Sequence, residues 1–247
     1  MTGGDHGPAW RTIPALAAGL LATMIGALAV LLLPLRGERR RRAVDAILRT
    51  WARFWCLATG ARITVDGLER LERSATYVVV SNHTSNLDPM IHLAVFGGGL
   101  RILAKRELFR VPLLGPAMRA AGLVEVDRRN ADQGSINRGV AEAFAAGSSL
   151  LVYPEGTFSY ETGMRPFKSG AFMIAIAHGV PILPVTLRGV DTVWPAHRLR
   201  IRRAEVHITI GTPLPTRHLT PQDAPALTSV ARTAITEALT TPLPNGH

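Results

Sequence analysis

A histidine and an aspartate occur five residues apart in a polar segment that directly follows an apolar run. The run is Tyr77–Val80, and the polar segment after it carries His83 and Asp88. Asp88 followed by Pro89 is typical of a helix start, with the aspartate as N-cap. A carboxylate there can bind one imidazole nitrogen, fix the tautomer and leave the other nitrogen as a base. The spacing is consistent with a general base, or with a pair that only stabilises the turn.

The sequence supplies no side-chain nucleophile to accompany this pair. It contains no G-x-S-x-G elbow, and its one cysteine, Cys56, lies in a different segment. A histidine base would therefore deprotonate a substrate hydroxyl directly. Residues 163–169 resemble a phosphate-binding loop only at their end, because Phe167 stands where a glycine is expected. We therefore exclude nucleotide triphosphatase activity.

A metal site is the alternative use of the same residues. Asp88 and His92 are four apart, on one face of the expected helix, and His83 would supply a third ligand. Such a site would indicate a metal-dependent hydrolase. The nearby sequence supplies no further obvious ligand, so we expect no metal.

Strand and helix patterns alternate from residue 61 to the carboxy terminus. This alternation predicts an α/β fold with a mostly parallel central sheet flanked by helices. Parallel sheets bind ligands at the carboxyl ends of their strands, so the segments at His83 and at Tyr153–Thr157 should face one crevice. The expected strands are 62–65, 76–81, 101–104, 123–126, 150–153, 182–187 and 205–210, with helices around 136–144, 169–178 and 224–239.

The amino-terminal 60 residues carry two helical patterns of a different kind. Residues 15–33 are uncharged and apolar, and a helix of this length, about 28 Å, nearly matches a bilayer core. A cleaved signal peptide fits less well because the run is longer than a signal core. The arginines that follow predict a cytoplasmic location for the rest of the chain. A hairpin lying on the membrane surface is the alternative to a span.

Residues 44–58 form the second pattern, an apolar stripe at helical spacing with arginines opposite. Because Trp51 and Trp55 lie on the stripe, we expect a helix in the bilayer interface, the alternative being a helix packed at the edge of the domain. The predicted organisation is thus a membrane segment, 1–60, followed by a catalytic domain, 61–247.

The overall charge points to anionic partners. The 247 residues contain 28 Lys+Arg and 18 Asp+Glu, a net charge of +10. The densest basic run flanks the apolar segment, and no RNA-binding aromatic signature occurs. We therefore expect a membrane partner and no nucleic acid. A single cysteine excludes a disulfide-stapled fold.

Four blocks in this order resemble the glycerolipid acyltransferases, the family of 1-acyl-sn-glycerol-3-phosphate acyltransferase. They cover residues 76–187, and the first is the H-x-x-x-x-D block of His83 and Asp88. The others are residues 122–128, which end in Asp-Arg, residues 153–157, Tyr-Pro-Glu-Gly-Thr, and residues 180–185.

The resemblance implies transfer of a fatty acyl group from acyl-CoA or acyl-carrier protein to a lysophospholipid hydroxyl, without cofactor or metal. His83 would be the base and Asp88 its orienting partner. Acceptor binding would fall to Lys105, Arg128, Glu155, Gly156 and Thr157. Members that use lysophosphatidate often carry arginine after Glu-Gly-Thr, where this chain has Phe158. Another lysolipid acceptor therefore remains an alternative.

Overall fold

A seven-stranded sheet forms the centre of the computed structural model, which describes residues 11–72, 75–126, 133–159 and 163–242. The strand order is β1-β7-β6-β2-β5-β3-β4, and only the β6–β7 pair is antiparallel. The strands are β1 (Ala61–Asp66), β2 (Val78–Ser81), β3 (Leu100–Lys105), β4 (Val124–Val126), β5 (Ser149–Val152), β6 (Ile182–Arg188) and β7 (Ala204–Ile210).

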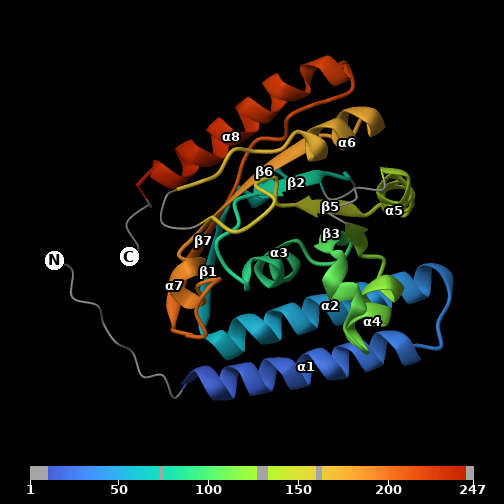
Figure 1. Ribbon diagram of the computed structural model, residues 1–247, viewed down its shortest axis with the longest axis vertical. Helices are drawn as coiled ribbons and strands as arrows, with labels where there is room; N and C mark the ends of the chain where they lie inside the picture. The colour runs from blue at the N-terminus through green and yellow to red at the C-terminus, as the bar shows by residue number, and fades with distance from the viewer. Residues whose placement is uncertain (1–10, 73–74, 127–132, 160–162, 243–247) are drawn as a thin grey trace.

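Helices cover both faces of this sheet (Figure 1). One face carries α5, α6 and α8, and the other carries α2 and α3, with α1 outside α2. The helices are α1 (Thr12–Leu32), α2 (Gly37–Thr59), α3 (Asp88–Phe96), α4 (Leu114–Ala120), α5 (Gln133–Ala145), α6 (Gly170–His178), α7 (Val190–Val193) and α8 (Ala224–Thr240). The predicted α/β class is confirmed, and each of the seven expected strands is present with small shifts at its ends.

Strand β2 lies at the centre of the sheet and is buried on both faces. Val78, Val79 and Val80 have no exposed surface, and they divide between two hydrophobic clusters. Val79 belongs to the cluster on the α2–α3 side, and Val78 and Val80 belong to the cluster on the α5–α6–α8 side. This burial explains the unbroken apolar run, which is typical of a parallel strand covered on both faces.

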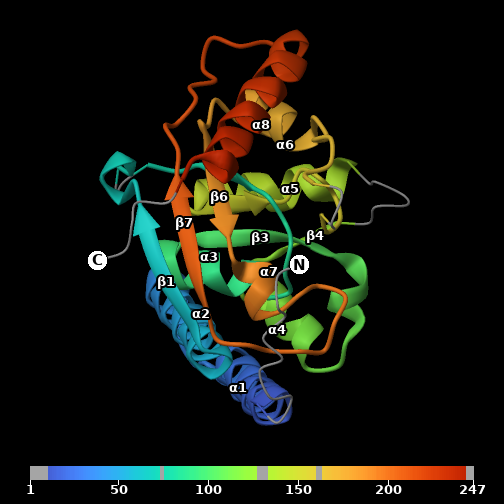
Figure 2. The same cartoon turned by 90° about the vertical axis from the view of Figure 1, so that its left-hand side faces the viewer.

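Helices α1 and α2 form an antiparallel hairpin along one side of the domain. Figure 2 shows α1 outermost, with α2 between it and the rest of the domain. The Trp51 and Trp55 indole N–H groups both donate to Thr23 Oγ1, at 2.9 and 3.2 Å. The Trp55 ring covers Gly19, where a Cβ would lie only 2.3 Å from the ring. The tryptophans of α2 therefore face protein rather than lipid, as in the alternative of a helix packed at the domain edge.

Candidate functional site

His83 and Asp88 form a hydrogen-bonded pair at the carboxyl end of β2. His83 Nδ1 lies 2.8 Å from Asp88 Oδ2. The Asp88 side chain has no exposed surface, whereas 14% of the His83 side chain is exposed. An ionised carboxylate only accepts hydrogen bonds, so Nδ1 is the donor in this contact, and in a neutral imidazole the lone pair is then on Nε2. This arrangement can orient an imidazole for proton transfer.

Asp88 is the first residue of α3 rather than its N-cap. The residue before it, Leu87, has helical backbone angles, and the Asp88 side chain turns back toward the loop. Its Oδ2 accepts the backbone N–H groups of Thr84 at 2.7 Å and Ser85 at 2.9 Å. The carboxylate therefore fixes the loop and the imidazole together, a tighter arrangement than a helix cap alone would give.

The loop after β5 meets the loop after β2 through Glu155. Val80 pairs with Val152 in the sheet, so His83 and Glu155 each lie three residues beyond a matched pair. The buried Glu155 carboxylate accepts the backbone N–H groups of His83 at 3.1 Å and Arg165 at 2.7 Å, and the hydroxyl of Ser159. Glu155 thus holds the backbone of His83 in place, and its carboxylate is occupied by these protein partners.

Two aromatic rings flank the His83 imidazole. The Tyr153 ring stacks on it with centroids 3.9 Å apart and planes 12° apart. The Phe158 ring lies 4.1 Å away at an interplanar angle of 36°. The rings restrict rotation of the imidazole and limit the water around it.

An apolar cavity of about 640 Å³ adjoins the pair. His83, Tyr153, Thr157 and Phe158 line it, and it continues between α1, α2, α3 and α4. Apolar residues that line this continuation include Val30, Ile47, Leu48, Met90, Leu93, Leu114, Met118 and Leu123. A cavity of this size and lining suits a hydrocarbon chain.

The other predicted site residues are only partly brought together. Thr157 and Lys105 both line the apolar cavity. Gly156 has a left-handed φ of +74°, and a Cβ there would lie 3.0 Å from Lys168 Nζ. Glycine is therefore needed at this turn, and its lack of a side chain leaves room for Lys168. Arg128 lies outside the described residues.

His92 is close to the pair but is not arranged as a metal ligand. Its Nδ1 donates to the Asp88 carbonyl oxygen at 2.8 Å, and its side chain is fully buried. Within the described ranges, no group of three or more His, Cys, Asp or Glu side chains could hold a metal ion. The hydrolase alternative therefore lacks a ligand set in that part of the chain.

The buried His92 predicts acid-sensitive folding. Desolvation lowers its pKa to about 4, against roughly 6.5 for an unperturbed histidine. The unfolded chain then binds more protons between these values, so stability should fall as the pH drops from about 6.5 toward 4. Urea unfolding across this range measures the slope, and His92→Gln should make it shallower. An unchanged slope in the variant would contradict the prediction.

Sequence reasoning missed the residues that position His83. Asn82 joins two strands by donating to the Leu187 carbonyl at 2.8 Å and accepting its N–H at 2.9 Å. A polar residue directly after an apolar strand was the available signal. The stacking of Tyr153 and Phe158 on His83 had no signal, because it depends on how two distant loops pack.

Comparison with known proteins identifies the family. A family model described as Acyltransferase matches residues 62–188, which include His83, Asp88 and the Glu155 turn. The chain belongs to the acyltransferase family.

Named relatives agree with this assignment. The human 1-acyl-sn-glycerol-3-phosphate acyltransferase alpha is 35% identical over 208 residues, 83% of this acyltransferase and 74% of that protein. The 1-acyl-sn-glycerol-3-phosphate acyltransferase of Borreliella burgdorferi is 28% identical over 183 residues, 74% and 73% of the two chains. The chain is thus an enzyme of this transferase class.

A solved structure shows the same fold. The crystal structure of the 1-acyl-sn-glycerophosphate (LPA) acyltransferase PlsC from Thermotoga maritima superimposes with a TM-score of 0.75. The match covers 95% of this acyltransferase and 100% of that chain at 24% identity. It therefore extends beyond the catalytic blocks into the amino-terminal helices.

Proposed function

We propose that this acyltransferase moves a fatty acyl group from an acyl-CoA or acyl-carrier-protein thioester to the free hydroxyl of 1-acylglycerol-3-phosphate, giving phosphatidic acid. The observation that carries the proposal is the His83–Asp88 pair, 2.8 Å apart, beside an apolar cavity of about 640 Å³. The acceptor, 1-acylglycerol-3-phosphate, is proposed because it occurs in the names of the relatives.

In the proposed reaction, His83 Nε2 takes the proton from the acceptor hydroxyl while that oxygen attacks the thioester carbonyl. The imidazolium that forms is stabilised by the Asp88 carboxylate. The tetrahedral oxyanion collapses, the carbon–sulfur bond breaks, and the departing thiolate takes the proton from His83. The Thr84 and Ser85 N–H groups already bind Asp88, and the Gly156 N–H donates to the Tyr153 carbonyl at 3.0 Å. We therefore assign oxyanion stabilisation to the backbone N–H of Thr157, which lines the same cavity.

Membrane attachment through the α1–α2 hairpin is part of the proposal. Among the described residues, α1 alone is long and apolar enough to cross a bilayer. Its outer face exposes Ile13, Leu20, Leu21, Met24, Ile25 and Leu32. Helix α2 packs along α1 and carries arginines that cannot enter hydrocarbon, so a monotopic hairpin fits better than a span. We place the catalytic domain on the cytoplasmic side.

Transfer assays with the purified enzyme test the function. Labelled acyl-CoA or acyl-carrier protein is supplied with lysophosphatidate or with lysolipids that have other head groups. We expect the highest kcat/KM with lysophosphatidate, and no loss of activity after chelation. A higher kcat/KM with another lysolipid would mean that lysophosphatidate is not the preferred acceptor. A loss of activity on chelation that is reversed by added metal would favour a metal-dependent enzyme.

The hypothesis of another lysolipid acceptor rests on Phe158, which stands where an arginine is often found after Glu-Gly-Thr. The Phe158 ring contacts His83. Because an aromatic contact of this kind is worth about 0.5–1.5 kcal/mol, Phe158→Ala should lower kcat by roughly two- to tenfold. The acceptor KM should change little if the ring only positions the base. Phe54→Ala, at an exposed site on α2, is the control. A changed KM with unchanged kcat would instead assign Phe158 to acceptor binding.

The apolar cavity should limit acyl-chain length. Gly26 of α1 lines it, and a Cβ there would meet Trp51 and Ile47 only at ordinary contact distances of 3.8–4.0 Å. Gly26→Leu should therefore fold, narrow the cavity and shift kcat/KM toward shorter acyl donors. Competition between donors of different length measures the shift, with Leu21→Phe on the exposed face as control. An unchanged profile would exclude this cavity as the acyl site.

A further inference from the structure

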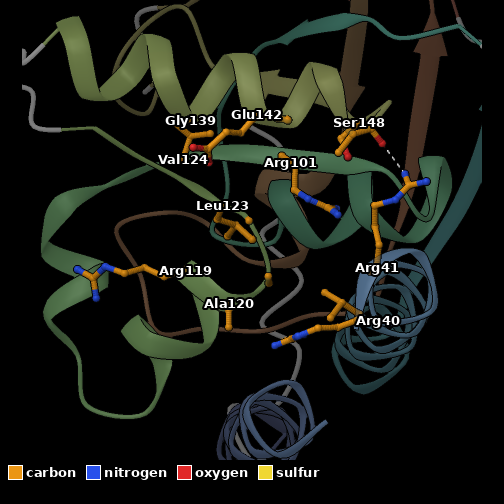
Figure 3. A pocket seen from close by; sticks show the side chains of 16 residues that line it. Arg40, Arg41, Arg101, Arg119, Ala120, Leu123, Val124, Gly139, Glu142 and Ser148 are labelled. Carbon is orange, nitrogen blue, oxygen red and sulfur yellow. Dashed lines mark hydrogen bonds between the residues drawn. The ribbon is translucent and has the colours of Figure 1, made fainter. Parts of the chain in front are cut away.

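A second cavity lies beyond the apolar one, at the end of the α1–α2 hairpin. It measures about 360 Å³ and lies between the start of α2, the end of α4 and α5 (Figure 3). Ala121 and Leu123 line both cavities, so the walls change there from apolar to basic. Four arginines line the second cavity: Arg40 and Arg41 from α2, Arg101 from β3 and Arg119 from α4.

The charge around this cavity is positive even when every paired carboxylate is counted. Arg41, Arg101 and Arg119 bind Glu38, Asp45 and Glu125 at 2.6–3.0 Å. Glu38 is shared with Arg42, and Glu125 with Arg106. Glu142 also lines the cavity. Counted over the described residues, the cavity arginines, the groups in their ion pairs and Glu142 comprise six arginines and four carboxylates. The surplus is two positive charges.

Two buried polar atoms on the cavity's lining residues lack hydrogen-bond partners among the described residues. They are Arg40 Nη1 and Ser148 Oγ. The Arg40 guanidinium is held from its other side, where Nη2 donates to the Val30 carbonyl at 3.2 Å. Ser148 has no exposed surface. A buried donor without a partner is costly, so these atoms indicate a missing acceptor.

The backbone around the cavity leaves room for that acceptor. Gly122 has a φ of +74°, and a Cβ there would approach Arg101 Nε to 3.2 Å. Gly37, Ala120, Gly139 and Ala146 supply further small walls. The lining thus combines guanidinium groups, a hydroxyl and small side chains, which is the chemistry of a phosphate site.

We propose that this cavity binds a phosphate group, separate from the acceptor phosphate at the catalytic site, with Arg40 as its principal donor and Ser148 as a further polar group of the lining. The phosphate belongs either to a phospholipid head group, because the cavity adjoins the end of α1, or to free inorganic phosphate. The proposal does not depend on the proposed function, since it requires only a bound anion.

Binding titrations followed by intrinsic tryptophan fluorescence and thermal unfolding test the proposal at constant ionic strength. The ligands are inorganic phosphate, short-chain dibutyryl phosphatidate and, as a zwitterionic control, dibutyryl phosphatidylcholine. Losing one charged hydrogen bond should weaken binding about ten- to hundredfold in Arg40→Gln, and Ser148→Ala should weaken it about two- to tenfold. Arg39→Gln, at an exposed site on α2, should bind like the wild type.

Lys105→Gln separates this cavity from the catalytic site, because Lys105 lines the apolar cavity. Binding that survives Lys105→Gln and is lost in Arg40→Gln supports the proposal. Saturation by inorganic phosphate identifies the free ion as a sufficient ligand, and saturation by phosphatidate alone identifies a head group. Wild-type affinity for both phosphate ligands in Arg40→Gln and in Ser148→Ala would overturn the proposal. So would the absence of binding to the wild type. If Arg40→Gln does not fold, Arg40→Lys and Ser148→Ala carry the test.

Discussion

Replacing His83 with alanine is expected to lower kcat by about 10²–10⁴-fold, the range for loss of a general base. The side chain is partly exposed and lies at the end of a strand, so its removal should leave the buried sheet intact. Acyl transfer to lysophosphatidate gives kcat, and circular dichroism with thermal unfolding checks the fold. His218→Ala, at an exposed position, is the matched control. Undiminished product from His83→Ala would exclude the proposed base.

Replacing Asp88 with asparagine is expected to reduce kcat by a similar factor, about 10²–10⁴-fold. Asparagine has nearly the same shape but carries no charge, so the imidazolium formed during the reaction loses its stabilising partner. The amide oxygen can still accept the Thr84 and Ser85 N–H groups, which bind Oδ2 at 2.7 and 2.9 Å. The loop should therefore keep its conformation.

Asp88→Ala is the companion variant that separates catalysis from folding. It leaves the Thr84 and Ser85 N–H donors without their acceptor, at a cost of about 1–3 kcal/mol each. Urea unfolding should show this loss in Asp88→Ala and little of it in Asp88→Asn, although both lose activity. Wild-type kcat in Asp88→Asn would mean that Asp88 only fixes the loop.

The turn after β5 differs from the pattern expected of the family at Phe158. The Glu155 carboxylate is occupied by the backbone of His83 and Arg165 and by the Ser159 hydroxyl. In place of the arginine often found after Glu-Gly-Thr, Phe158 packs on the imidazole. Lys168 lies beside Gly156, Lys105 lines the cavity, and Arg165 binds Glu155 through its backbone, so three cationic residues lie near this turn. The lysolipid panel is therefore the measurement that decides the head group.

The arginines after α1 belong both to a pattern in the sequence and to a cavity in the structure. The arginines after α1 carry a topology signal in the sequence, but Arg40 and Arg41 also line a defined cavity with Arg101 and Arg119. Arg40 and Arg41 are neighbours in the chain, but Arg101 and Arg119 lie far from them, and the four share no motif. Spacing could not reveal them as a group, because a helix, a strand and a second helix bring them together.

The amino-acid sequence by itself determined the alternation of strands and helices, the pairing of His83 with Asp88, and the apolar first helix. Local patterns fix these features: a buried strand needs an unbroken apolar run, and a tight loop holds His83 near Asp88. The tertiary structure alone decided which way α2 faces, because the same tryptophans suit either lipid or a neighbouring helix. It also decided that Glu155 binds the backbone of His83 and that two aromatic rings contact the His83 imidazole. These depend on the β2–β5 register, which aligns two loops about 70 residues apart in the chain.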